Sequence, residues 1–132
     1  MNSHLAQMTP AAKLLGREIL SDAPDGAKRI RYVARPEFAN RHGTVQGGLL
    51  AAMLDSATSA ALLCELPPEM TSVTAKLETV FLKPAPLGSL VAVTRLISRE
   101  EKRAFAEAEL LAPDGTTVAK ATAELRILPR KP

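Results

Sequence analysis

Hydrophobic and polar positions alternate along most of the chain, and the first third already shows this pattern. Apolar residues at near-helical spacing over positions 4–15, interrupted by Pro10, predict a short N-terminal helix. Residues 16–22 predict a first strand. After a turn at Asp25-Gly26, alternation over residues 29–34 predicts a second strand. The core face of this second strand carries Ile30, Tyr32 and Ala34.

A long apolar run interrupts the alternation and predicts a central helix over about residues 47–64. A helix that is apolar on all sides is normally buried, so we expect this one at the centre of the fold. Pro67-Pro68 follows its end. A membrane span is disfavoured, because the run is shorter than ~20 apolar residues and carries Asp, Ser and Thr near its middle.

The rest of the chain predicts four consecutive strands, which lie within residues 71–83, 90–97, 104–110 and 118–128. Ala112-Pro113-Asp114-Gly115 is a strong hairpin signal. Since strands and helices do not alternate, a parallel sheet is excluded. The predicted fold class is α+β, an antiparallel sheet packed on a central helix. The core face of the last strand carries Ala119, Ala121, Ala123, Leu125 and Ile127.

Composition narrows the classes of function. A length of 132 residues with 46% hydrophobic positions fits one domain spanning residues 1–132. A net charge of +3 and 3% aromatic residues argue against nucleic-acid binding. The single cysteine, Cys64, and the lack of a secretory signal favour the cytoplasm. His4, His42 and Cys64 show no metal-ligand spacing, so we expect no metal.

Asp55 is the only charged residue between Arg41 and Glu65, and it lies in the middle of the apolar helix. Burying a carboxylate is costly unless something compensates for the lost water, so Asp55 is the first catalytic candidate. Gly47 and Gly48 open the same helix. Their N–H groups and the helix dipole suit the oxyanion of an attacked carbonyl. Tight packing of helix on sheet explains these glycines equally well.

The spacing between Gly47 and Asp55 predicts an oligomer. Asp55 follows Gly47 by eight positions, which is ~12 Å along the axis at ~1.5 Å per residue. That separation is too large for both groups to act on one carbonyl carbon. If both are catalytic, they come from two chains whose helices run antiparallel, so we expect a homodimer with shared active sites.

The stretch from Asn40 to Asp55 resembles the signature of a known family. Asn40 is followed six residues on by Gln46-Gly47-Gly48, with Asp55 nine residues after Gln46. Hotdog-fold acyl-CoA thioesterases of the phenylacetate-pathway (PaaI) type are similar, with Asn, then His-Gly-Gly, then Asp at the same spacing. Residues 81–88 and 112–115 resemble the family's segment after its third strand and its closing hairpin.

The resemblance covers roughly residues 10–128 and carries several implications. It implies a hotdog fold, in which an antiparallel sheet wraps around the central helix. It implies hydrolysis of an acyl-CoA thioester, aryl or short to medium in its acyl group, to free acid and CoA. No cofactor is implied, since CoA is part of the substrate. It also favours a dimer of dimers, a homotetramer, over a simple dimer.

Gln46 departs from the family pattern, because a His stands at that position in the family. A glutamine can donate a hydrogen bond to a thioester oxygen but cannot carry a proton. A register that begins at His42-Gly43 places Ala51 where the acid belongs. We therefore interpret His42 as a loop histidine.

The resemblance implies a role for each residue of the motif. Asp55 would be the nucleophile or general base, and the partner chain's Gly47 N–H would polarise the carbonyl oxygen. Asn40 would orient the attacking water or the thioester, and Gln46 would assist the oxyanion site. Thr74 aligns with a Ser or Thr that some members place near the catalytic acid.

CoA is polyanionic, and basic residues in segments that resemble family loops would hold its phosphates. These are Lys83, Arg99, Lys102 and Arg103. Another function stays open: a hotdog protein that binds acyl-CoA or another small ligand without hydrolysing it, which the Gln46 departure favours. A hydratase on the same fold is weaker, because the helix contains no His.

Overall fold

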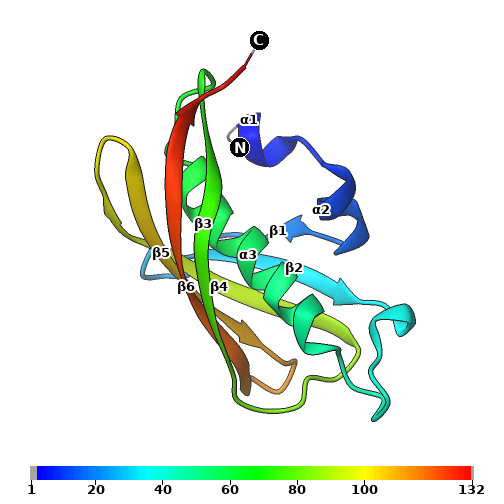
Figure 1. Cartoon of the computed structure of the whole chain (residues 1–132). Helices are drawn as coiled ribbons and strands as arrows, with labels where there is room; N and C mark the ends of the chain where they lie inside the picture. The colour runs from blue at the N-terminus through cyan, green and yellow to red at the C-terminus, as the bar shows by residue number, and fades with distance from the viewer. Residues whose placement is uncertain (1–2, 132) are drawn as a thin grey trace.

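A single antiparallel sheet curves around one long helix in the computed structural model, which describes residues 3–131 (Figure 1). The strand order is β1-β2-β4-β5-β6-β3, and every pairing is antiparallel. This arrangement confirms the α+β class and the hotdog architecture. The elements are α1 (Ser3–Ala6), α2 (Pro10–Leu14), β1 (Glu18–Ile19), β2 (Lys28–Ala34), η1 (Pro36–Phe38), α3 (Gly47–Leu63), β3 (Met70–Phe81), β4 (Gly88–Arg99), β5 (Arg103–Leu111) and β6 (Thr117–Pro129).

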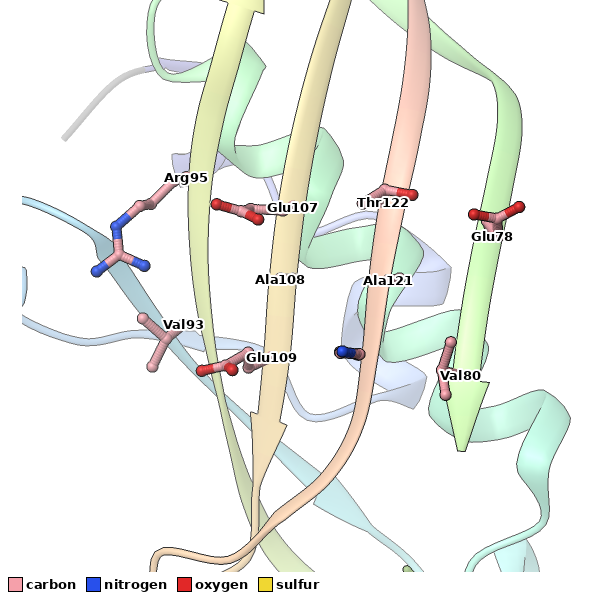
Figure 2. Close-up of a pocket in the computed structure, with 10 residues that line it drawn as sticks. Glu78, Val80, Val93, Arg95, Glu107, Ala108, Glu109, Ala121 and Thr122 are labelled. Carbon is pink, nitrogen blue, oxygen red and sulfur yellow. The ribbon is translucent and has the colours of Figure 1, made fainter. Parts of the chain in front are cut away.

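The outer face of the sheet, turned away from α3, carries charged residues in register. In the strand register Arg95 of β4 lies opposite Glu107 of β5, and Glu107 lies opposite Thr122 of β6. A shallow hollow of about 410 Å³ lies here, and Figure 2 shows its side chains on four neighbouring strands. Glu107 and Glu109 share this face.

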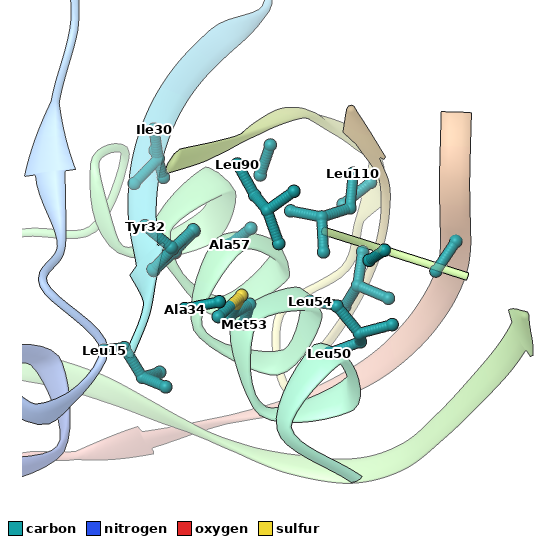
Figure 3. Packing of buried hydrophobic residues seen from close by; sticks show 14 of the residues in the cluster. Leu15, Ile30, Tyr32, Ala34, Leu50, Met53, Leu54, Ala57, Leu90 and Leu110 are labelled. Atoms are coloured by element: carbon teal, nitrogen blue, oxygen red, sulfur yellow. The ribbon is translucent and has the colours of Figure 1, made fainter. Parts of the chain in front are cut away.

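The inner face packs against α3 and forms the core. The predicted core residues of β2 and β6 are all at most 5% exposed. From α3, Met53, Leu54 and Ala57 are fully buried against the strands (Figure 3). Thr58 is also buried, and its hydroxyl donates to the Leu54 carbonyl at 2.9 Å, so the core keeps no unpaired hydroxyl at this position.

The N-terminal region differs from the prediction. Two short helices, α1 and α2, replace the single helix expected over residues 4–15. Pro10 lacks an N–H and suits the first turn, so it starts α2, with the Thr9 side chain capping the Ala12 N–H at 3.1 Å. The strand expected over 16–22 shrinks to two residues, because Gly16 with φ +63° still belongs to the turn that ends α2.

The helix α3 is where predicted, but it is not buried on all sides. Gly48 is exposed, and Ala52, Asp55 and Ser59 are only half-buried. The expectation of a fully buried Asp55 is therefore wrong for the single protomer. The sheet covers one side of α3 and leaves the side that carries these residues open (Figure 1). The strand β3 is at the edge of the sheet, with β6 as its one neighbour.

Candidate active site

Asp55 and Thr74 meet between α3 and β3. Thr74 Oγ1 donates a hydrogen bond to Asp55 Oδ1 at 2.7 Å. The strand register shifts between Thr74 and Lys76, and such a bulge re-aims a side chain next to it. Within residues 3–131 no other hydrogen bond reaches this carboxylate, so one oxygen is held and the other has no hydrogen-bond partner among these residues.

A hollow of about 420 Å³ lies at the start of α3 and is separate from the Asp55–Thr74 pair. Three predicted site residues, Asn40, Gly47 and Lys83, line it. Most of its other walls are apolar, from Val45, Leu50, Phe81, Leu82, Pro84 and Ala85.

Two backbone N–H groups are available at this helix start. The Gln46 carbonyl accepts from Leu49 N at 2.9 Å and Leu50 N at 3.3 Å. Among the described residues, nothing accepts a hydrogen bond from Gly47 N–H or Gly48 N–H. A partially positive helix end beside an apolar wall suits a polarised carbonyl oxygen attached to an apolar acyl group.

The Phe81 ring flanks Gly47. A Cβ built on Gly47 would lie 3.5 Å from two ring atoms, which is ordinary van der Waals contact. Phe81 is also 53% exposed, so a large apolar ring stands at the open rim of the hollow. The sequence resemblance pointed to the segment around Phe81 but not to this contact.

Asn40 organises the loop that forms the rim of the hollow. Its Oδ1 accepts from the backbone N–H of His42 at 2.9 Å and of Thr44 at 3.2 Å, and its Nδ2 donates to Thr44 Oγ1 at 3.0 Å. The turn also depends on Gly43, whose φ is +81°. The side chain is engaged by its own loop, so orientation of a water or thioester by Asn40 stays a prediction.

Gln46 caps α3 through its backbone alone. Its N–H donates to the Phe38 carbonyl at 2.9 Å, and its side chain makes no capping hydrogen bond. The side chain is exposed, and Gln46 is not among the described residues that line the hollow. The structure therefore brings the backbone of Gln46 to the site without its amide, and its assistance to the oxyanion stays a prediction.

The four basic residues predicted to hold CoA phosphates do not form one cluster in a protomer. Lys83 lines the hollow at the start of α3. Arg99 donates to the Glu65 carbonyl at 3.4 Å, just beyond the end of the same helix. With 17 residues, α3 is ~25 Å long, so these positions are far apart. Lys102 and Arg103 lie with Arg99 at the β4–β5 turn.

Arg103 is also engaged by its surroundings. Its guanidinium pairs with Glu100 at 3.1 Å and lies 5.3 Å from the centre of the Phe105 ring. Such a partnered arginine is less available to a phosphate than Lys83, for which the described residues show no ion pair. Lys83 is thus the best placed of the four for contact with a ligand in the hollow.

Sequence reasoning missed a partly buried hydrogen bond made by Ser56, the residue after Asp55. The hydroxyl of Tyr32, a fully buried residue of β2, donates to Ser56 Oγ at 2.8 Å. Burial raises the pKa of Tyr32 well above its usual value, so the phenol stays protonated and acts as a donor. The only sign of this in the sequence is the single tyrosine on a core face.

Among the described residues, Cys64 shows no sign of a reactive thiol, and no cluster of side chains forms a metal site. Partial burial raises the pKa of the Cys64 thiol, which disfavours the thiolate and agrees with a small structural residue. Over residues 3–131 no three His, Cys, Asp or Glu side chains gather in a way that could hold a metal ion. No helix in the same range has the length and apolar character to span a membrane.

Known proteins resemble this chain in sequence and in fold. The family model for the thioesterase superfamily matches residues 42–119. A phenylacetic acid degradation-related protein from Ralstonia eutropha JMP134 has 37% identity over 89% of this chain and 90% of that one, with a TM-score of 0.82. A Bacillus halodurans protein solved with CoA has 28% identity over 93% of this chain and 81% of that one, with a TM-score of 0.82. Acyl-coenzyme A thioesterase 13 of Homo sapiens is 28% identical over 99 residues, 74% of this chain and 70% of that protein.

Proposed function

The chain belongs to the thioesterase superfamily, and we propose that it hydrolyses an acyl-CoA thioester at active sites shared by two protomers. The observation that carries the proposal is the held carboxylate of Asp55, two helical turns beyond a helix start with free N–H groups. CoA as the thiol half is supported by the Bacillus halodurans relative, which was solved with CoA. The single cysteine of the chain fits action in the cytoplasm.

Sharing between protomers is supported by two open surfaces. The strand β3 is 12 residues long and is the last in the sheet, with Val73 and Val80 half-exposed. Natural proteins rarely leave so long an edge unprotected. Beside it lies the open side of α3, whose only charge is Asp55. Two copies paired through β3 would set Gly47 of one protomer opposite Asp55 of the other, and two such dimers would form the expected dimer of dimers.

The mechanism assigns one task to each group. The thioester carbonyl oxygen accepts from Gly47 N–H of the partner subunit, which stabilises the oxyanion. Asp55 removes a proton from a water that attacks the carbonyl carbon, or attacks that carbon itself. Thr74 holds one carboxylate oxygen by its hydrogen bond, so the other faces the reacting carbon. Collapse of the tetrahedral intermediate expels CoA and leaves the free acid.

A thiol-release assay tests this function. A panel of aryl- and alkyl-CoA thioesters is measured with wild type and with Asp55→Asn, which keeps the size of the side chain and loses the base. We expect turnover to fall by about 10²- to 10⁴-fold with the oligomer unchanged by light scattering. Full activity in Asp55→Asn would overturn the proposal.

Mixed dimers test whether sites are shared. Co-expression of Asp55→Asn with Gly47→Pro, which removes the N–H, gives heterodimers with one intact and one doubly defective site. Random pairing then restores about a quarter of wild-type activity, since half the dimers are mixed and each has one of two sites. A mixture as inactive as either parent would place both groups in one protomer.

A second function is favoured by Gln46. The Gln46 amide cannot take up and release a proton, and it lies outside the hollow. Both facts fit a protein that holds acyl-CoA without cleaving it. Tight binding of acyl-CoA by calorimetry, together with no thiol release across the panel, would establish that function instead.

A further inference from the structure

We propose that His42 supplies the proton that Gln46 cannot, and acts as the general acid toward the departing CoA sulfur. The inference rests on the proposed function, because it assigns a residue to the same site. It concerns the one step that the groups described so far leave without a donor. Asp55 takes a proton during attack, and the Gly47 N–H stabilises charge without transferring a proton.

The position of His42 carries the inference. His42 lines the same hollow as Gly47, at the start of α3 where the carbonyl oxygen would bind. The other titratable residue among the described lining residues is Lys83. A lysine ammonium normally stays charged at neutral pH, whereas an imidazole both holds and releases a proton there. Of the two, the imidazole is therefore suited to general acid catalysis.

Hydrogen bonds within the loop hold the backbone at His42. The His42 backbone N–H donates to Asn40 Oδ1 at 2.9 Å. Asn40 N donates to the Thr44 carbonyl at 2.7 Å, and Gly43 N donates to the Asn40 carbonyl at 3.1 Å. Asn40 thus positions the backbone of His42 at the rim of the hollow, although its own side chain is engaged by the loop.

The charged residues beside His42, in the loop sequence and in the lining of the hollow, are cations. Arg41 precedes His42 in the same exposed loop, and Lys83 enters the hollow from the segment after β3. No carboxylate is among the described residues that line the hollow. The described lining therefore offers no carboxyl group as an alternative proton donor to the sulfur.

The proton balance of the step is complete. Water adds to the carbonyl carbon and loses one proton to Asp55. The C–S bond then breaks, its electron pair goes to sulfur, and the His42 imidazolium transfers its proton to that sulfur. Solvent carries the proton of Asp55 back to His42. The net reaction is thioester plus water to carboxylic acid plus thiol.

The experiment compares His42→Ala with Arg41→Ala, a matched loop variant outside the proposed machinery. With the best acyl-CoA of the panel, we expect His42→Ala to lose about 10²-fold in kcat and to lose the alkaline limb of its pH profile. Arg41→Ala should stay within about threefold of wild type. Adding Gln46→His to His42→Ala, which puts an imidazole at the helix start, should restore at least part of the lost rate and the limb.

A truncated substrate separates proton transfer from contact with the nucleotide. The same acyl group on N-acetylcysteamine has the sulfur but lacks the phosphates of CoA. If His42 is a general acid, His42→Ala lowers kcat about 10²-fold on this thioester as well. If His42 only contacts a phosphate, the substitution changes KM for CoA substrates alone. Wild-type kcat and pH profile in His42→Ala, or a defect confined to KM for CoA substrates, would overturn the inference. An inactive wild type would instead overturn the proposed function.

Discussion

The two ends of the proposed site use different chemical groups, although the same helix, α3, carries both. At the start of α3 the groups aimed at a ligand are backbone N–H donors, with apolar walls around them. Near the middle of α3 the group is a side chain, Asp55, fixed by a second side chain on β3. The first end needs a helix to begin at Gly47. The second needs two particular functional groups and a strand bulge to aim one of them.

This contrast predicts how each end responds to substitution. Backbone donors survive most side-chain changes, so the binding end fails only when the N–H itself is lost or covered. The carboxylate end fails when one side chain changes. Since ~12 Å separates Gly47 from Asp55 along the helix, neither end compensates for the other within a chain. Variants at each end therefore test the comparison independently.

Gly47→Pro should produce the largest effect at the binding end. Proline suits the first helical position and removes one N–H. Gln46, with φ −58° and ψ 132°, already has the extended backbone that a residue before proline requires. We expect kcat to fall by about 10²- to 10³-fold with the fold intact by circular dichroism.

Gly47→Ala is the matched control for that variant. It keeps the N–H, and its Cβ would make only ordinary contact with the Phe81 ring at 3.5 Å. We expect it to retain most of the wild-type rate. Equal losses in Gly47→Ala and Gly47→Pro would mean that space at this position matters, and the N–H would lose its assigned role.

Thr74→Val should produce the next largest effect, now at the carboxylate end. Valine keeps the shape and strand preference of threonine but removes the hydroxyl that donates to Asp55 at 2.7 Å. A hydrogen bond to a charged group is worth about 1.5–3 kcal/mol, which corresponds to about 10- to 100-fold in kcat if the bond acts in the transition state. Steady-state kinetics with the best thioester measures the change.

Thr74→Ser completes the test of the carboxylate end. It keeps a hydroxyl at the same bulge and should remain within about fivefold of wild type, well short of the loss expected from the missing bond. An unchanged rate in Thr74→Val would show that Asp55 is oriented by its helix alone, and the two ends of the site would then differ less than the structure implies.

The same contrast explains what the sequence could predict. Alternation placed Ile30, Tyr32 and Ala34 on the core face, because sheet geometry depends on neighbours two residues apart. The motif spacing predicted Asp55 and Gly47 because a helix converts residue number into distance. The hydrogen bond from Tyr32 to Ser56 links positions 24 residues apart through tertiary packing, which no local pattern records.

The missed and misplaced features have the same physical origin. The exposed side of α3 could not be predicted from its apolar composition, since apolar residues occur both in cores and on exposed apolar patches. The placement of Lys83 and Arg99 near opposite ends of α3 likewise depends on strand order. His42 and Gly47 line the same hollow, and hydrogen bonds to Asn40 close the loop that carries His42. The sequence motif does not record these hydrogen bonds.

Tyr32→Phe should have the smallest effect on turnover, and it sharpens the contrast between catalytic and structural hydrogen bonds on α3. Ser56 follows Asp55 directly, yet its partner is a fully buried phenol. Removing that hydroxyl should lower the free energy of unfolding by about 1 kcal/mol, because half-buried Ser56 can find water. We expect kcat within about twofold of wild type, since the packing of Tyr32 against α3 is kept.

Ser56→Ala should be the more harmful change to stability, even though alanine favours helices. It leaves the Tyr32 hydroxyl buried without an acceptor, which costs about 1–3 kcal/mol, whereas the double variant removes both partners and should be nearly as stable as Tyr32→Phe. Urea unfolding at one fixed protomer concentration measures all three, because association of subunits makes stability concentration-dependent. If Tyr32→Phe instead lowered kcat more than about tenfold with stability unchanged, the bond would act through Asp55, and the carboxylate end of the site would extend across α3 to β2.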